Sequence, residues 1–353
     1  MKKLNRYVST SISNSILLVL FIIIGFDSIA AIIDEVSLIE GNYTFSAVLI
    51  FVLFSVPGNV FDWLPFSALV GSLAGLGTLA SSSELVVMRS AGVSTLKIVW
   101  MVMRPTIVIM LIGTLIAEYV APVTENIAQS DRAIALHNTE NILNKEGLWH
   151  REGNDFMHFN VVQPNGVLYG VTIYSFDDQR HLVQTLVADR AIYQSDHWLL
   201  EDFSVSLLGS DTIEVKTGIS DIWETELTPN LLKFLVLDPI DLSIEGLWQY
   251  SNYREQQGLN SGQYRLALWK KILQPVSTLS LVLIAISFIF GPLREVTMGF
   301  RIFIGVLFGV VFRTVQDMMS PASLVYGFEP LYASLIPIVT CLIIGGWFLR
   351  RAK

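Results

Sequence analysis

Apolar residues gather in six long stretches of this chain, three before and three after a long polar segment. A helix needs about 20 apolar residues to cross a hydrocarbon core ~30 Å thick, and each stretch is close to or above that length. The pattern therefore predicts an α-helical polytopic membrane protein with six transmembrane helices and one inserted domain. The stretches cover residues 12–33, 45–80, 98–120, 268–290, 300–318 and 331–349.

The second stretch is the longest, and at 1.5 Å per residue its helix would extend for about 50 Å. Pro57 and Pro65 lie inside it, where proline kinks a helix because it removes a backbone donor. We predict one long, kinked helix that projects beyond the bilayer. Two crossings would instead move the basic loop that follows to the opposite side of the membrane.

Short runs of β-branched and aromatic residues alternate with turn residues in the polar segment. Regular short strands of this kind are typical of antiparallel sandwiches and jelly rolls, so we expect an inserted β-jelly-roll domain. Helical patterns flank it at 121–144 and 244–256. The expected strands are 155–162, 167–176, 182–193, 198–208 and 212–223.

Lysine and arginine cluster at four points outside the apolar stretches. Basic loops stay on the cytoplasmic side because anionic lipid and the membrane potential oppose their translocation. With both termini and two short basic loops inside the cell, the inserted domain must lie outside. The clusters are Lys2/Lys3/Arg6, Arg89/Lys97, Arg294/Arg301 and Arg350/Arg351/Lys353.

These patterns divide the chain into three parts. Residues 1–122 are expected to form transmembrane helices 1–3, with a cytoplasmic helix at about 82–91. Residues 123–264 are expected to form the extracytoplasmic β-domain, and 265–353 transmembrane helices 4–6.

Composition agrees with a membrane protein, since 52% of the residues are hydrophobic, 15% are charged and the mean hydropathy is +0.54. The net charge is unevenly distributed. Residues 125–255 hold 21 acidic and 8 basic residues, whereas the rest holds 10 acidic and 15 basic ones. An acidic domain on a basic membrane part argues against nucleic-acid binding. The single cysteine, Cys341, excludes a disulfide within one chain.

The sequence contains no G-x-x-x-x-G-K-[ST] phosphate loop and no G-x-S-x-G nucleophile motif. Its histidines lack the spacing of metal ligands. We therefore expect the chain to have no enzymatic activity by itself and to bind no cofactor or metal. The histidines are His137, His150, His158, His181 and His197.

A short helix is predicted in the basic loop between the second and third stretches. Ser81-Ser82-Ser83-Glu84 fits a capping box, in which Ser81 accepts from an early backbone N–H and Glu84 reaches back. Gly92 is suited to a left-handed end of this helix. The expected apolar face consists of Leu85, Val86 and Met88.

Such a helix, inside the cell and parallel to the membrane, is suited to docking a soluble motor protein. Apolar residues would enter a groove of the partner, while two charged residues fix the orientation. The alternative is a surface helix that merely closes a hairpin. The predicted coupling residues are Glu84, Leu85, Met88, Arg89 and Gly92.

Small residues and charges inside the apolar stretches form a second group of candidates. The pairs Gly71/Gly75 and Gly305/Gly309 permit close helix packing. Charges at membrane depth are costly and normally face protein or water. Arg313 and Asp317, at i and i+4, are expected to pair, with proton relay involving them and Asp27 as the alternative.

Lys270 and Lys271 lie at the outer end of the fourth stretch, where the positive-inside rule expects few cations. One interpretation is that their side chains extend to lipid headgroups. The other is a basic rim that receives an anionic, phosphorylated ligand from the outer leaflet.

Several longer motifs resemble the LptF/LptG permease family, and the resemblance covers essentially the whole chain. Within the family the chain is more similar to the LptG type than to the LptF type. The motifs are Gly71-x-x-x-Gly75-x-Gly77, Ser83-Glu84-Leu85-Val86-Val87-Met88, Glu118-Tyr119-Val120-Ala121-Pro122, Gly147-Leu148-Trp149, Ser287-Phe288-Ile289-Phe290-Gly291-Pro292-Leu293-Arg294 and Leu324-Val325-Tyr326-Gly327.

The resemblance implies a permease subunit of the ABC transporter that extracts lipopolysaccharide from the inner membrane of Gram-negative bacteria. Implied partners are an LptF-like permease, an LptB-like ATPase dimer that uses ATP and Mg, and LptC, which has one membrane span and a periplasmic jelly roll. The inserted domain would then be periplasmic, and Glu84 would be the carboxylate that contacts the ATPase.

The resemblance also implies where substrate is bound. The first and fifth spans would form lateral gates, with apolar side chains such as Phe26, Ile33 and Phe312 along the acyl chains. Arg132 matches a family position implicated in binding the anionic substrate. Lysines that relatives carry near the end of the first span and after the second-span proline are absent here, at 30–38 and Gly58. We therefore expect Lys270, Lys271 and Arg132 to contact more of the phosphate charge.

Two other functions remain open at this point. An ion-coupled secondary transporter would use the charges within the spans, and its activity would follow an ion gradient without ATP. A membrane-anchored assembly or scaffold protein would use only its outer domain as a docking surface.

Overall fold

The computed structural model describes residues 2–137, 147–163, 166–194, 196–209, 212–229, 231–232, 238–256, 259–291 and 296–351. The chain forms two compact units. A helical unit comprises Met1–Ala30, Val56–Pro122 and Pro239–Lys353, and a β unit comprises Ala31–Ser55 and Val123–Asp238. Residues 138–144 of the expected helix, and Pro292, Leu293, Arg294 and Lys353 of the expected motifs and basic clusters, lie outside the described residues.

Within the described residues, six helices are long and apolar enough to cross a membrane, as the hydrophobic pattern predicts. The third of these spans continues in the chain from α4 through one π-helical turn, η1, into α5. The spans are α1 (Lys2–Val36), α2 (Phe45–Ser81), α4 (Thr95–Leu115) with η1 (Ile116–Val120) and α5 (Ala121–His137), α8 (Gly262–Phe290), α9 (Met298–Tyr326) and α10 (Pro330–Arg351).

The second span is one helix of 37 residues with Pro57 and Pro65 inside it, which confirms the prediction of a single crossing. Two shorter helices complete the helical unit. They are α3 (Glu84–Ser90) and α7 (Ile244–Gln256), and the bounds of α7 agree with the predicted helix.

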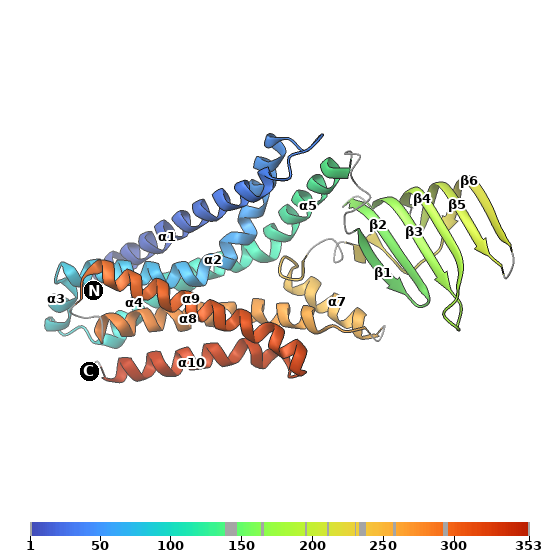
Figure 1. Ribbon diagram of the computed structural model, residues 1–353. Coiled ribbons are helices and arrows are strands. Elements are labelled where there is room, and N and C mark those ends of the chain that lie inside the picture. The colour runs from blue at the N-terminus through green and yellow to red at the C-terminus, as the bar shows by residue number, and fades with distance from the viewer. Residues whose placement is uncertain are drawn as a thin grey trace. The chain divides into compact units, whose positions relative to one another are not determined.

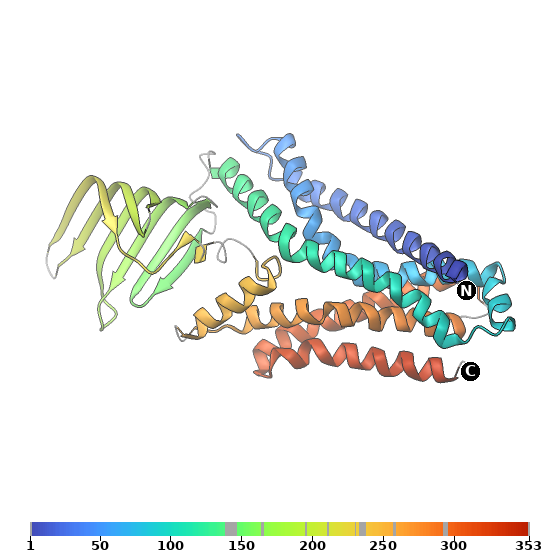
Figure 2. The ribbon, with the colours of Figure 1, turned by 180° about the vertical axis from the view of Figure 1, so that it is seen from behind.

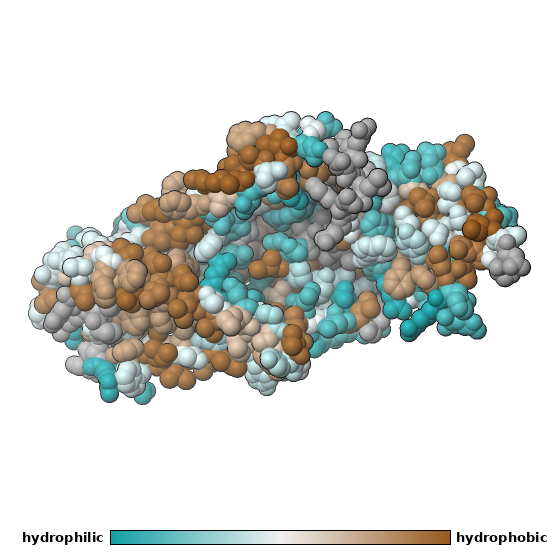
Figure 3. Space-filling view, viewed as in Figure 1, coloured by the Kyte–Doolittle hydropathy of each residue, from teal (hydrophilic) through white to brown (hydrophobic). Residues whose placement is uncertain are grey.

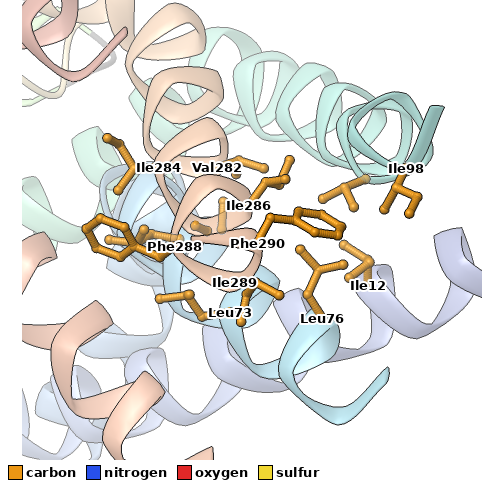
Figure 4. Close-up of a cluster of buried hydrophobic side chains, with 14 of the residues drawn as sticks. Ile12, Leu73, Leu76, Ile98, Val282, Ile284, Ile286, Phe288, Ile289 and Phe290 are labelled. Atoms are coloured by element: carbon orange, nitrogen blue, oxygen red, sulfur yellow. The ribbon is translucent and has the colours of Figure 1, made fainter. Parts of the chain in front are cut away.

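The core of the helical unit forms around α8, whose aliphatic and aromatic residues pack against α1, α2 and α4 (Figure 4). In its most apolar 18-residue window α8 is 61% buried, whereas the window of α1 is 11% buried. Ser280 and Ser287 are buried in α8, but their hydroxyls donate to carbonyls of the same helix at Ser277 and Ile284. These two hydroxyls are therefore satisfied within the core, while α1 presents apolar side chains outward. Hydrophobic surface over the helices is visible in Figure 3.

The β unit contains an antiparallel sheet of six strands, each paired with its neighbour in the chain. The inserted antiparallel domain is thus confirmed, as one sheet in chain order within the described residues. A jelly roll has two sheets whose strands are joined by crossing connections, and the described residues contain no such connection. The strands are β1 (Leu148–Glu152), β2 (Asp155–Gln163), β3 (Val167–Phe176), β4 (Leu182–Gln194), β5 (His197–Leu208) and β6 (Ile213–Trp223).

A line of irregular positions crosses this sheet from β2 to β6. One pair is missing from each ladder between β2 and β6, at Asn160, Gly170, Asp189, Asp202 and Ile219. Gly170 and Asp202 have φ values of 61° and 51°, respectively. The alternation shifts by one residue there, so Trp198 is buried before the line and Phe203 packs against the same core after it. Irregular positions of this kind bend strands, which lets one sheet curve around a single apolar core.

Gly170 lies where a side chain would be excluded on two grounds. Its φ is left-handed, and an added Cβ would overlap the Asn160 side chain. Gly170→Ala is expected to destabilise the β unit by more than the ~1–2 kcal/mol of the backbone term alone. Thermal unfolding of the full chain in detergent, followed by tryptophan fluorescence, measures this.

Gly153→Ala is the matched control, because Gly153 has a φ of 57° and nothing within 4 Å of an added Cβ. Gly153→Ala should lower the stability only by the cost of the left-handed backbone conformation, without a steric overlap. Equal destabilisation by the two substitutions would contradict the close approach across β2 and β3.

Candidate functional site

The short helix α3 lies at the same end of the helical unit as both chain termini (Figures 1 and 2). It begins after Ser83, whose φ is 62°, and ends at Gly92, whose φ is 87°. The Gly92 N–H donates to Arg89 and the Val93 N–H donates to Met88, which is the pattern of a Schellman end. The predicted glycine stop is therefore confirmed.

The predicted capping box is wrong. Helix α2 continues to Ser81, so the Ser81 hydroxyl donates back to the Thr78 carbonyl at 2.9 Å. No side chain caps α3, and the Glu84 carboxylate accepts from Ser82 at 3.0 Å and from Tyr7 at 3.3 Å. The capping-box pattern gave no sign that the preceding helix would include its first serine.

The faces of α3 divide the predicted coupling residues into two groups. Leu85 and Met88 are buried in the core of the helical unit, with 4% and 6% exposure. Val86 and Val87 point outward, with 58% and 63% exposure. Of the expected apolar face, Leu85 and Met88 therefore fix α3 to the membrane helices, while Val86 lies on the outer face with Val87.

Two open grooves flank α3, and Arg89 lines both of them. One has a volume of 670 Å³ and runs from Leu85 and Val86 to Phe290, whose ring lies 5.8 Å from the Arg89 guanidinium carbon. The other has a volume of 460 Å³ and runs past Gly92 to Leu349. This end of the unit thus combines an exposed apolar face of α3 with two grooves. Glu84 lies in the first turn of α3 and Arg89 in its last turn.

The small residues of α2 lie against α1. A methyl group at Gly71 would be 2.5 Å from the Cα of Ile16, and one at Gly75 would be 2.9 Å from the Cδ1 of Ile12. These two glycines therefore set how closely α1 and α2 approach each other.

The small residues of α9 lie against the other side of α2. An added Cβ at Gly305 would overlap Leu73, and one at Gly309 would lie 2.7 Å from the Phe66 ring. Both small-residue pairs thus serve packing around α2.

A polar network around residues 59–63 of α2 joins this helix to α1 and α9. Asp27 of α1 accepts from Asn59 at 2.8 Å and from the Trp63 indole at 3.1 Å. The guanidinium of Arg313 lies 4.1 Å from the centroid of a Trp63 ring. Asp27 and Arg313 therefore both contact side chains of α2.

The neighbouring lysines Lys270 and Lys271 occupy different environments. Lys271 is 6% exposed, donates to the Leu242 carbonyl at 2.6 Å and lies 5.9 Å from the centroid of the Phe61 ring. Lys270 is partly exposed and lies 3.6 Å from Asp317. The geometry favours Lys271 as an anchor of the segment before α7, and Lys270 as the lysine that a ligand can reach.

Within the β unit, Arg132 of α5 is paired with Glu35. Its Nε donates to the Glu35 carboxylate at 2.9 Å, and its guanidinium lies 5.5 Å from the centroid of the Phe51 ring. Tyr43 donates to the same carboxylate at 2.7 Å, and burial together with this bond raises the pKa of Tyr43 to about 12. The expected role of Arg132 in binding an anionic substrate would therefore require the anion to compete with Glu35.

The expected acyl-chain residues are divided between surface and interior. Phe26 and Ile33 on α1 are 71% and 67% exposed, whereas Phe312 on α9 is 7% exposed. Sequence reasoning missed Asp62 and Trp63, a carboxylate and an indole that interrupt the apolar run of α2. These two polar residues within an apolar run could have marked the site in the sequence.

Comparison with known proteins gives a whole-length match. Residues 6–351 match the model of the family "Lipopolysaccharide export system permease LptF/LptG". The LptG permease of Escherichia coli K12 is 36% identical over 352 residues, which cover 99% of this chain and 98% of that protein. LptG of Haemophilus influenzae is 35% identical, with 99% of each chain covered.

The chain belongs to the LptF/LptG family. The resemblance inferred from its motifs is thereby confirmed. So is the architecture of six apolar helices with an antiparallel sheet inserted between the third and fourth of them in the chain. Among the described residues of this LptF/LptG member, no group of three His, Cys, Asp or Glu side chains could hold a metal ion.

The two lysines of α8 provide a test of the site geometry. Lys271→Met leaves the buried Leu242 carbonyl without its donor, which should lower the free energy of unfolding by about 1.5–3 kcal/mol. Thermal unfolding of the full-length permease in detergent measures the loss. Lys270→Met is the control and should change stability little, since the ion pair of Lys270 with Asp317 is long and partly exposed. Equal losses would refute the anchor role of Lys271.

Proposed function

We propose that this chain is the LptG-type permease subunit of an ATP-driven transporter that extracts lipopolysaccharide from the bacterial inner membrane. The observation that carries the proposal is the whole-length similarity to lipopolysaccharide export permeases, at 35–36% identity. The chain would be paired with an LptF-like permease, driven by an LptB-like ATPase dimer and joined by an LptC-like protein.

In this proposal both termini and α3 face the cytoplasm and the β unit is periplasmic. The basic residues near the termini and α3 support that orientation, because cations are retained on the cytoplasmic side. The location of both termini and α3 at one end of the helical unit is consistent with it (Figure 1).

The force generated by ATP hydrolysis in the partner is transmitted to this chain through α3. Closure of the ATPase dimer pushes on Glu84, Val86, Val87 and Arg89, and the buried Leu85 and Met88 transmit the force to the core of the helical unit. Because α2 ends directly before α3 and α4 begins directly after it, the push moves both long spans.

Movement of the spans narrows a cavity between the two permeases and expels the lipid. Exposed apolar residues of α1, including Phe26 and Ile33, contact the acyl chains. Each CH₂ group favours apolar surroundings by ~0.8 kcal/mol, so extraction of several chains needs an external energy source. The chain has no phosphate loop of its own, which makes an ATPase partner necessary.

The coupling role of Glu84 can be tested by charge reversal. Glu84→Lys should reduce co-purification of the ATPase with the permease pair by about tenfold or more, since it replaces the carboxylate at the docking face with a cation. Nucleotide hydrolysis by the purified complex should fall in proportion.

Glu214→Lys is the control, because Glu214 is an exposed carboxylate on β6 of the periplasmic domain. It should leave both readouts unchanged. Full retention of the ATPase by the Glu84→Lys complex would contradict the proposed docking site.

A further inference from the structure

A cleft between α2, α8 and α9 has no role in the coupling mechanism. It has a volume of 120 Å³, and one part of its lining is charged while the other is apolar. The charged part consists of Asp62, Lys270, Arg313 and Asp317, and the apolar part includes Pro65, Phe66, Leu281 and Phe312.

The cations of the cleft are held loosely by their partner. Lys270 Nζ lies 3.6 Å from Asp317, and Arg313 Nε lies 3.8 Å from the other oxygen of the same carboxylate. Both separations exceed normal charge-assisted hydrogen-bond distances of ~2.7–2.9 Å. Arg313 is oriented by its stacking on Trp63. The N–H groups of the two cations are therefore positioned to donate to an anion that approaches more closely than Asp317.

The second carboxylate of the cleft, Asp62, accepts no hydrogen bond among the described residues. Arg313, Lys271 and Lys270 act on it only through electrostatic attraction. A carboxylate within a transmembrane helix normally faces a cation, a donor or water, because its transfer to hydrocarbon is costly. Asp62 is thus placed to receive a ligand group that carries N–H donors.

The apolar part of the cleft is shaped by close packing of α9 on α2. The absent side chain of Gly309 lets α9 approach the Phe66 ring, and Phe312 is buried beside them. An amphiphile can place its polar group among the four charges and the start of an acyl chain against these rings.

We propose that the cleft binds the phosphoethanolamine group of a lipid. Its phosphate contacts Lys270 and Arg313, and its ammonium donates to Asp62 and Asp317. Two cations and two carboxylates complement a zwitterion better than an anion, because a lone phosphate would face both carboxylates uncompensated. A choline group would fit less well, because its quaternary nitrogen has no N–H to donate.

Two lipids could supply this chemistry: phosphatidylethanolamine of the membrane, and a glycolipid decorated with phosphoethanolamine. The proposal does not depend on the transport function. Loss of ATPase coupling in Glu84→Lys would leave it intact, and failure of lipid binding would leave the transport proposal intact.

The experiment uses the full-length permease within its purified complex, delipidated and reconstituted in glycolipid-free nanodiscs. Bound lipid is counted by native mass spectrometry in discs of phosphatidylethanolamine, phosphatidylcholine or phosphatidylglycerol with identical acyl chains. A preference of about tenfold for phosphatidylethanolamine over each of the other two is expected. If phosphatidylethanolamine shows no preference but an added phosphoethanolamine glycolipid binds tenfold better than its undecorated form, the glycolipid is the ligand.

Substitutions assign the contacts. Asp62→Asn with Asp317→Asn should abolish the preference over phosphatidylglycerol without loss of phosphatidylglycerol binding. Lys270→Gln with Arg313→Gln should weaken binding of all three phospholipids. Lys216→Gln, on exposed β6, is the control and should bind as the unaltered chain does.

Either of two results would overturn the proposal. One is equal binding of ethanolamine-bearing and ethanolamine-free lipids of both classes to the unaltered chain. The other is an unchanged preference in the Asp62→Asn/Asp317→Asn variant, whose fold is checked independently by its thermal unfolding.

Discussion

Burial of Leu85 and Met88 is the interaction on which the proposed mechanism depends. Outside the spans, α3 has only seven residues, too few to form a stable helix by itself. Its two buried side chains join it to the core formed by α1, α2, α4 and α8. A force applied to the exposed face of α3 therefore acts on the packed spans and is not lost in a flexible loop.

The hydrocarbon environment explains the remaining polar features of the helical unit. Buried Ser280 and Ser287 donate to carbonyls of their own helix, and Asp27 accepts from Asn59 and Trp63. Lys271 holds the Leu242 carbonyl, and Glu118 accepts from the backbone N–H of Ile244 at the start of α7. The charges around Asp317 differ from these groups, because they are loosely paired, and among the described residues Asp62 accepts no hydrogen bond.

Hydropathy and turn residues predicted the spans and five of the strands, because both depend on local patterns. Strand β1 was missed, since its five residues are too few for a periodic signal. The shift of alternation at Gly170 and Asp202 was also missed, because it depends on pairing across strands.

For the site, spacing correctly placed α3 and its glycine end. It could not tell that Val86 points outward, or which of two adjacent lysines is buried, since both follow from packing between distant segments.

The central claim is that α3 and the spans beside it move as one body when the ATPase closes. Spin labels at the exposed positions Val87 on α3, Leu96 on α4 and Phe21 on α1 would report this, since the native Cys341 is buried. Pulsed electron paramagnetic resonance on the complex, with and without nucleotide, measures the separations. The account predicts that the Val87–Leu96 and Val87–Phe21 distances both stay constant, because α1 packs on α2 at Gly71 and Gly75 and belongs to the same core. A nucleotide-dependent change in the Val87–Leu96 distance would contradict it.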